Sequence, residues 1–229
     1  MSSKTKLSII IPFYNESSNL KKLHSKLIKV LSKLKFKSEI IYIDDGSKDG
    51  GVNILTKITK KRKNISIKIL KLPKHSGQTK AISKGISQAN GELVSFLDAD
   101  LQNDSKDLIT MVNKIAQGYD AVFGWRKNRK DSLSKKLSSK LANFLIRIFF
   151  KTSLHDVGCS IKVVKREVLL KTLLFGQSHR ILPLLIIKGG AKTTEIVVNH
   201  KKRTSSKSKY NYTRTFNLII DLARLKFSS

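Results

Sequence analysis

Aspartate side chains are concentrated in two short stretches of this sequence. The stretch FLDADLQND occupies residues 96–104, and YIDDGSKDG occupies residues 42–50. Together they contain six of the chain's 16 acidic residues, namely Asp44, Asp45, Asp49, Asp98, Asp100 and Asp104. Carboxylates crowded in this way repel one another, so the arrangement favours a bound cation.

Asp98 and Asp100 have the D-x-D spacing of two carboxylates that can share a divalent cation, and small Ala99 permits a turn between them. Mg²⁺ prefers oxygen ligands, commonly one or two carboxylates together with substrate phosphates. A cation bridged to a diphosphate would stabilise the charge that develops on a departing nucleoside diphosphate. Capping and turn aspartates show the same spacing, so D-x-D alone leaves both interpretations open.

The stretch DDGSKDG at 44–50 is typical of turns, because Asp, Gly and Ser favour turn conformations. It resembles a calcium loop only superficially, because the spacing differs and the distal Glu is missing. A carboxylate at a strand end can instead accept a hydrogen bond from a base or a ribose. Tyr14 is a candidate for stacking on a base, and an ordinary half-buried tyrosine explains it equally well.

Both aspartate clusters follow segments that have the pattern of buried strands. Apolar runs predict strands over 6–12, 39–44, 65–70, 92–98 and 120–124, and helical spacing predicts helices over 16–34, 52–59, 77–89 and 105–117. This alternation indicates an α/β fold with a mostly parallel central sheet and flanking helices. The aspartates then lie at the carboxyl ends of strands, where open α/β sheets bind ligands.

The second half of the chain is less regular and more basic. It is predicted to contain helices over 133–149 and 179–190, strands over 158–165 and 192–203, a basic loop at 203–209, and an amphipathic helix over 213–227. The apolar side chains of the helix at 133–149 fall on one face. Such a face is typical either of a helix packed on the core or of a helix resting on a membrane.

The net charge of +30 indicates attraction to phosphate-bearing substrates, anionic lipid or nucleic acid. A general abundance of lysine on solvated faces explains the charge as well. Cys159 is the single cysteine, so it has no disulfide partner within this sequence. The apolar runs are far shorter than the ~20 residues that cross a bilayer. We therefore expect no transmembrane segment and a cytoplasmic location.

Several motifs, in their order and spacing, resemble glycosyltransferase family 2, the inverting enzymes of the GT-A fold. The resemblance extends over nearly the whole chain and is carried by SIIIPFYNESSNL, IYIDDGSKDGG, SGQTKAISKGISQANGELVSFLDADLQND, DVGCSIKVVKREVL, HRILPLLIIKGGAKTTEIVVNHKKR and SKSKYNYTRTFNLIIDL. Within the family, the sequence is most similar to polyprenyl-phosphate glycosyltransferases, including dolichol-phosphate mannose synthases. This resemblance implies a Rossmann-like GT-A domain over 1–229, in which 1–125 binds the nucleotide sugar and 126–229 binds the acceptor.

The resemblance also implies a role for each matching residue. Asp98, Asp100 and Gln102 would hold Mg²⁺ or Mn²⁺, and Arg126 would contact phosphate. Arg suits bidentate phosphate contacts and Lys supplies a mobile charge, so the loop at 203–209 would close over a diphosphate. Ser206 of this loop stands where relatives usually have glycine. The full nucleotide-sugar site would comprise Pro12, Tyr14, Glu16, Ile43, Asp45, Asp98, Ala99, Gln102, Arg203 and Lys209.

Asp156 matches an acceptor-side aspartate of the family, and Asp100, Arg126 and Asp156 form the expected catalytic set. A lipid phosphate is already ionised at neutral pH, so for that acceptor Asp156 would position rather than deprotonate. For a sugar hydroxyl, Asp156 is the first candidate base. A capping role before Gly158 is the structural alternative.

We therefore expect an inverting, metal-dependent transfer of a sugar from a nucleotide-sugar donor to a polyprenyl phosphate, such as dolichyl or undecaprenyl phosphate, in the synthesis of cell-envelope glycans. Basic side chains and apolar helix faces would give peripheral association with an anionic membrane. One alternative is a family 2 enzyme with a hydroxyl acceptor on a glycan or a lipid-linked sugar. The other is a nucleic-acid-binding protein, which the 7% aromatic content and the lack of a recognisable module disfavour.

Overall fold

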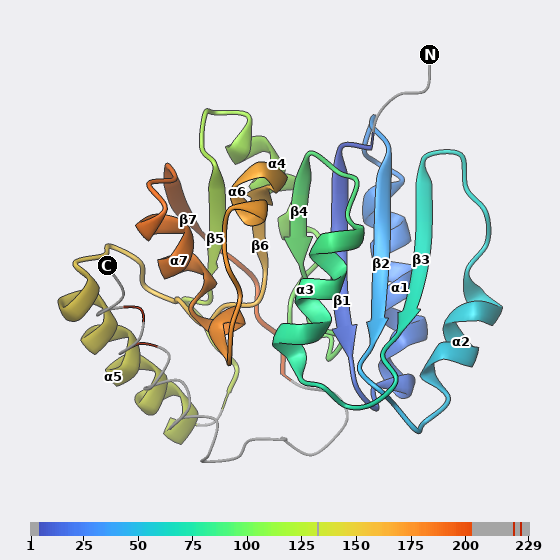
Figure 1. The fold of residues 1–229 in the computed structure, drawn as a ribbon, viewed down its shortest axis with the longest axis horizontal. Helices are drawn as coiled ribbons and strands as arrows, with labels where there is room; N and C mark the ends of the chain where they lie inside the picture. Colours follow the sequence, from blue (N-terminus) through green and yellow to red (C-terminus); the bar gives the residue numbers. More distant parts are fainter. Residues whose placement is uncertain (1–4, 132, 203–221, 223–224, 226–229) are drawn as a thin grey trace.

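The computed structural model describes residues 5–131, 133–202, 222 and 225 of the chain. Within these residues, the strands form one seven-stranded sheet in the order β3-β2-β1-β4-β6-β5-β7 (Figure 1). The strands are β1 (Leu7–Phe13), β2 (Ser38–Asp44), β3 (Ile65–Lys71), β4 (Leu93–Phe96), β5 (Ala121–Trp125), β6 (Lys162–Lys165) and β7 (Thr193–Val197).

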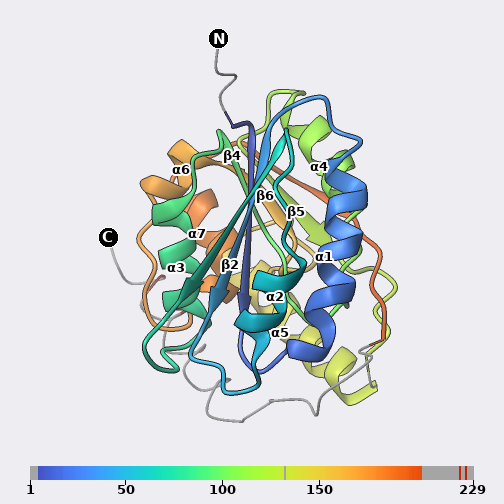
Figure 2. The same ribbon diagram turned by 90° about the vertical axis from the view of Figure 1, so that its right-hand side faces the viewer.

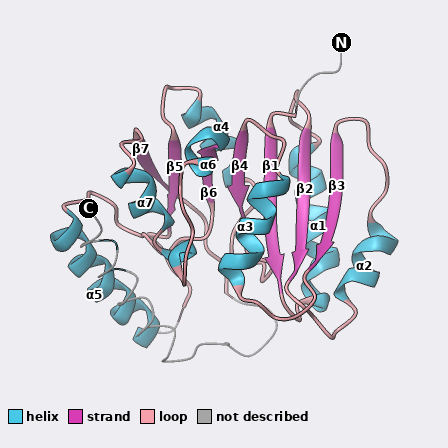
Figure 3. Cartoon of the chain, viewed as in Figure 1, coloured by secondary structure: helices cyan, strands magenta, loops and turns pink. Residues whose placement is uncertain are grey.

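Helices cover both faces of the sheet. Figure 2 shows α1 and α4 on one side, with α3, α6 and α7 on the other. The helices are α1 (Ser17–Leu31), α2 (Gly51–Ile58), α3 (Gln78–Gln88), α4 (Asp107–Ile115), α5 (Leu133–Phe150), α6 (Arg166–Leu170) and α7 (Leu182–Lys188), with a 3₁₀ turn, η1, at Ser178–Arg180. The architecture is therefore helix layer, sheet, helix layer (Figure 3).

The central strands are continuous apolar runs because both of their faces are buried. On β2, Ile40 and Tyr42 pack in the core beside α1, and Ile41 and Ile43 pack in the core beside α3. Gly85 of α3 permits this approach, since an added Cβ would lie 2.5 Å from Ile10 Cγ2. Residues on both faces of the same strand thus fix its position between the two helix layers.

All strands except β6 run in the same direction. β1 pairs in parallel with β2 and β4, and β5 pairs in parallel with β7. β6 lies antiparallel between β4 and β5. The carboxyl ends of β1, β2, β4 and β5 therefore open at one edge of the sheet, which confirms the mostly parallel α/β arrangement expected from the sequence.

The second half differs from the sequence prediction in detail. The expected strand over 158–165 begins only at Lys162, and the one over 192–203 is limited to Thr193–Val197. The expected helix over 179–190 is divided into η1 and α7, and Pro183 stands in the first turn of α7. Proline suits that position because its missing N–H would have no helical partner there. The short helix α6 was not predicted.

Helix α5 confirms the helix expected over 133–149, but the interpretation that its apolar face packs on the core is wrong. That face is 43–72% exposed at Leu137, Leu141, Phe144, Leu145, Ile148 and Phe149, whereas Ile146 on another side of the helix is only 7% exposed. Figure 1 shows α5 set apart from the sheet. Among the described helices, none combines the length and the apolar character needed to cross a bilayer.

The basic loop expected at 203–209 and the helix expected over 213–227 lie outside the described residues, apart from Leu222 and Leu225. Leu225 is 4% exposed and belongs to the core cluster on the α3 and α7 side.

Candidate active site

A cleft of about 640 Å³ opens at the carboxyl edge of the sheet. Each of four parallel strands contributes the residue or residues that follow its end, which places Tyr14, Asp45, Asp98 and Arg126 together. The cleft contains most of the residues expected from the sequence: Pro12, Tyr14, Glu16, Asp45, Asp98, Ala99, Asp100, Gln102 and Arg126. Their meeting point is the ligand position typical of open α/β sheets.

Two of the expected residues that the structure describes, Ile43 and Asp156, are not among those that line this cleft; Asp156 lines the second cavity described below. Ile43 is fully buried, because its position in the alternation of β2 directs it into the core beside α3. Arg203 and Lys209 lie outside the described part of the chain.

The D-x-D pair is held by a strained turn after β4. Ala99 is 4% exposed and packs in the core, while Asp98 Oδ1 accepts a hydrogen bond from Gln78 Nε2 at 2.9 Å. Asp100 Oδ1 accepts one from the backbone N–H of Gln102 at 3.1 Å. The left-handed residue of the turn is Leu101, with φ of 64°. A backbone in this region costs about 1–3 kcal/mol, and such strain is concentrated at functional sites.

The donor set of this turn fits a hard divalent cation. Asp98 and Asp100 supply carboxylates and Gln102 an amide, and all three residues line the cleft. Among the described residues no group of three His, Cys, Asp or Glu side chains has metal-binding geometry. Two carboxylates are nevertheless a common protein share for Mg²⁺, which takes further ligands from substrate phosphates and water. Carboxylate and carbonyl oxygens suit Mn²⁺ equally.

An aromatic pair lies at the β1 and β2 side of the cleft. The rings of Tyr14 and His75 stack with centroids 4.0 Å apart and an interplanar angle of 19°. His75 Nδ1 lies 2.8 Å from Asp45 Oδ2. Sequence reasoning identified Tyr14 as a stacking candidate but missed His75, which is the ring that Tyr14 contacts.

The carboxylates of the 44–50 cluster are occupied by backbone N–H groups. Asp45 accepts hydrogen bonds from Ser76 N at 2.7 Å and Gly77 N at 3.0 Å, which joins the end of β2 to the start of α3. Asp49 accepts one from Ser17 N at 2.7 Å. The turn interpretation thus accounts for much of this cluster. Gly46, with φ of 76°, is required because a Cβ there would lie 2.6 Å from the backbone of His75.

Arg126 and Asp156 form a bidentate ion pair at the other side of the cleft. Arg126 Nε donates to Asp156 Oδ2 at 2.7 Å, and Nη2 donates to Oδ1 at 2.8 Å. Burial raises the pKa of Asp156, but the hydrogen bonds and the charge of Arg126 outweigh it and leave that pKa below its ordinary value. Burial lowers the pKa of Arg126, but the hydrogen bonds that Arg126 donates to Asp156 outweigh this effect and raise that pKa. Both groups therefore stay charged at neutral pH.

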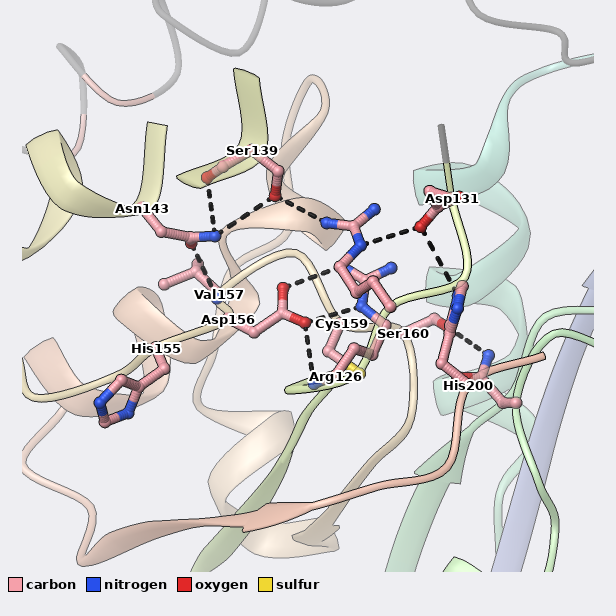
Figure 4. A network of polar contacts seen from close by, with 12 residues as sticks. Arg126, Asp131, Ser139, Asn143, His155, Asp156, Val157, Cys159, Ser160 and His200 are labelled. Atoms are coloured by element: carbon pink, nitrogen blue, oxygen red, sulfur yellow. Dashed lines mark hydrogen bonds and ion pairs between the residues drawn. The ribbon is translucent and has the colours of Figure 1, made fainter. Parts of the chain in front are cut away.

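A wider polar network surrounds this pair (Figure 4). Arg129 donates to Asp131 Oδ2 at 2.9 Å and to Ser139 Oγ at 2.7 Å, which connects the loop after β5 to α5. Asn143 Nδ2 donates to the Ser139 carbonyl at 3.0 Å. His200 Nδ1 accepts a hydrogen bond from Lys130 N at 3.3 Å, so the segment that precedes the expected basic loop also contacts this network.

Lys162 is a buried lysine that sequence reasoning missed. It is 4% exposed, lines the cleft, and donates to the carbonyl oxygens of Cys159 and Ser160. Its backbone partner across the sheet is Phe96, two residues before Asp98. Burial is the largest influence on the Lys162 pKa and lowers it, while the nearby charge of Asp98 acts in the opposite direction.

A second cavity of about 780 Å³ lies on the α5 side of the Arg126–Asp156 pair. It shares Arg126, Arg129, Ser139 and Asn143 with the cleft. Phe144, from the exposed face of α5, lies at its lining. The cations that line it are Arg126, Lys127, Arg129, Lys130, Lys136, Lys140 and Arg147. This composition suits an anionic group attached to an apolar chain.

The residues that sequence reasoning missed share one property. They lie on segments that only the tertiary fold brings to the site: His75, Gln78, Ser139, Asn143 and Lys162. Gln78 and Lys162 stand within motifs that carry the family resemblance, and Ser139 and Asn143 lie in the Lys- and Arg-rich stretch 124–151.

Comparison with known proteins agrees with this geometry. The sequence matches the family described as Glycosyl transferase family 2 over residues 8–173. Dodecaprenyl-phosphate galacturonate synthase of Rhizobium johnstonii is 35% identical over 225 residues, which cover 96% of this chain and 66% of that protein. Undecaprenyl-phosphate 4-deoxy-4-formamido-L-arabinose transferase of Photorhabdus laumondii is 36% identical over 217 residues, with 95% and 66% covered. The chain thus spans just under two thirds of the length of these relatives.

A solved structure gives the same fold. The glucosyl-3-phosphoglycerate synthase of Mycobacterium tuberculosis, in complex with Mn²⁺, UDP and phosphoglyceric acid, superimposes with a TM-score of 0.75 at 15% identity. The match covers 98% of this chain and 80% of that one. At this identity the likeness establishes the fold alone.

Proposed function

Because the chain belongs to glycosyltransferase family 2 and has its GT-A fold, we propose that it transfers a sugar from a nucleotide-sugar donor to a polyprenyl phosphate, with inversion at the anomeric carbon and with a divalent cation. One observation carries the proposal for the acceptor. The Arg126–Asp156 pair separates a cleft that contains the D-x-D acids from a basic cavity bordered by an apolar helix face.

On the donor side, the nucleoside would lie near Tyr14, His75 and Asp45, and the diphosphate would lie beside Asp98 and Asp100. A divalent cation held by these two acids and Gln102 would neutralise the charge that develops on the departing diphosphate. Arg126, which also lines the cleft, would add a positive charge in a fixed position, because Asp156 holds its guanidinium in one orientation.

On the acceptor side, the state of Asp156 favours a phosphate over a hydroxyl. Its carboxylate accepts three hydrogen bonds from Arg126, the third from the backbone N–H at 3.2 Å, and its pKa is lowered. A carboxylate held in this way is a weak base. A lipid phosphate needs no base: one of its ionised oxygens attacks the anomeric carbon, the bond from that carbon to the donor diphosphate breaks, and nucleoside diphosphate leaves.

The lipid acceptor would be reached at a membrane surface. The exposed side chains of α5 give an apolar face, and Lys136, Lys140 and Arg147 of the same helix line the basic cavity. Basic residues near an anionic surface contribute about 1 kcal/mol each to membrane binding. The apolar face would add the burial of its side chains among the acyl chains.

An acceptor competition tests the proposal. The protein is incubated with a panel of nucleotide sugars and Mn²⁺, together with equal amounts of undecaprenyl phosphate and an undecaprenyl-linked sugar that offers only hydroxyl groups. Mass spectrometry should find the added sugar on undecaprenyl phosphate. Addition to the lipid-linked sugar alone would replace this proposal with the hydroxyl-acceptor reaction.

A further inference from the structure

The turn that carries Asp156 is held by a carboxylate from a distant strand. We propose that Glu195 and His155 are positioning residues of the transfer reaction, because they fix the backbone that presents Asp156 to Arg126. This inference rests on the function proposed above and adds two residues to its machinery. Neither residue lines the cleft that holds the D-x-D acids.

Glu195 binds three donors of the turn with one carboxylate. The backbone N–H of His155 donates to Glu195 Oε1 and Oε2 at 2.9 and 2.8 Å, and the N–H of Asp156 donates to Oε1 at 3.1 Å. His155 Nδ1 lies 2.9 Å from Glu195 Oε2. The Glu195 side chain is only 10% exposed, so these bonds compete little with water.

The position of Glu195 is set by the sheet itself. β7 pairs in parallel with β5, and Glu195 is the register partner of Phe123, which lies three residues before Arg126. The same pair of strands therefore carries Arg126 at the end of one and the support for Asp156 on the other. The 155–156 turn is therefore supported by a residue of a rigid strand rather than by a loop.

His155 adds an aromatic contact to this support. Its ring stacks on Trp125 with centroids 4.1 Å apart and an interplanar angle of 16°, and Trp125 directly precedes Arg126. Figure 4 shows His155 directed away from the Asp156 carboxylate, which points toward Arg126. Glu195, His155 and Trp125 thus hold the outside of the turn while Asp156 holds the guanidinium on the inside.

Glu195→Gln is the variant that tests this role. It keeps the shape of the side chain, but in either orientation its amide NH2 group faces a backbone N–H donor of the turn. The NH2 group would take the place of Oε2, 2.8 Å from His155 N, or that of Oε1, 2.9 Å from His155 N and 3.1 Å from Asp156 N. Glu39→Gln is the matched control, because the 1% exposed Glu39 also accepts a backbone N–H, from Asn90, and a side-chain donor, Ser8 Oγ. Glu39 lies near the start of β2, at the opposite end of that strand from the cleft.

Trp125 provides a readout that needs no substrate, since it is the only tryptophan in the sequence. The emission of an indole depends on the groups in contact with its ring, and His155 stacks on Trp125. Release of His155 by Glu195→Gln should therefore change the Trp125 emission of the folded protein, and Glu39→Gln should leave it unchanged. Both variants should unfold at lower temperature than the wild type.

The kinetic readout separates positioning from general loss of structure. Glu195→Gln should lower kcat by about tenfold to a hundredfold, as expected for small misplacement of a reacting group, and leave the donor KM within about twofold. Glu39→Gln should change neither after correction for the folded fraction. Unchanged Trp125 emission in Glu195→Gln, or a kcat loss no larger than that of Glu39→Gln, would overturn the inference. Failure of the wild type to use polyprenyl phosphate would instead reject the proposed acceptor. The kcat of the same two variants would then be measured with the acceptor that the wild type does use, and their Trp125 emission would be compared as before.

Discussion

The carboxylate of Asp156 and the guanidinium of Arg126 face each other through two parallel hydrogen bonds of 2.7 and 2.8 Å. The Asp156 side chain is 4% exposed and that of Arg126 is 14% exposed, so the pair is largely shielded from water. A planar guanidinium held in this way has a fixed orientation. Arg126 borders both cavities, so its orientation affects both the donor side and the acceptor side.

Loss of one partner from this pair should be costly. Asp156→Asn leaves the Arg126 charge without its counter-ion, and we expect the free energy of unfolding to fall by about 3 kcal/mol. Urea denaturation measures the change. Glu92→Gln is the control, because the Lys6–Glu92 pair is 45% and 43% exposed and should contribute at most about 1 kcal/mol. Equal effects of the two substitutions would show that burial of the Arg126–Asp156 pair has no energetic consequence.

The lowered pKa of Asp156 gives this contribution a defined pH dependence. Its ordinary value is about 3.9, and the folded value lies below it. The stability that the ionised carboxylate contributes is therefore fully present above about pH 4 and is lost as the pH falls through the folded pKa. The difference in unfolding free energy between wild type and Asp156→Asn should be constant at neutral pH and shrink in acid. A difference that instead shrank between pH 6 and 8 would contradict the shift.

Gln78 should affect metal binding through Asp98. Its Nε2 donates to Asp98 Oδ1, and loss of a hydrogen bond that orients a metal ligand typically weakens metal affinity about 10–100-fold. We expect this loss for Mn²⁺ in Gln78→Leu, measured by calorimetry with nucleoside diphosphate present. Gln88→Leu, at the exposed far end of the same helix, is the control. Unaltered Mn²⁺ affinity in Gln78→Leu would show that Gln78 does not contribute to metal binding.

The exposed face of α5 should bind lipid. Replacement of Leu141, Phe144 and Ile148 by Gln should remove most binding to vesicles that contain phosphatidylglycerol, because these side chains are 51–59% exposed on one helix face. Binding of the wild type should also weaken as salt is raised. Leu170→Gln with Leu173→Gln changes exposed apolar residues elsewhere and should have little effect. If the two sets of substitutions reduce binding equally, α5 is not the lipid-binding element.

The order of strands and helices in the first half could be predicted because each strand is rich in apolar residues, which are buried in every strand except the edge strand β3, and because each helix has one apolar face. The positions of Tyr14, Asp45 and Asp98 followed from this, since each comes directly after such a run. The role of Asp156 could only be left open, because its partner Arg126 lies 30 residues away in sequence.

The remaining features depend on contacts that no local pattern encodes. The antiparallel insertion of β6 between β4 and β5 places Lys162 beside the D-x-D turn. The stack of His75 on Tyr14 depends on the approach of two loops at Gly46. The face of α5 has the same periodicity whether it packs on a core or meets a membrane, so only the structure could show that it does not pack on the core.

The central claim is that Asp98 and Asp100 hold a cation beside a diphosphate while the donor sugar moves to a lipid phosphate. Phosphorus NMR of undecaprenyl phosphate, incubated with the protein and its donor, tests this directly. We predict conversion of the phosphomonoester to a phosphodiester with Mn²⁺ or Mg²⁺, and none with excess chelator or with a folded Asp100→Asn variant. Equal conversion with chelator or in that variant would contradict the claim.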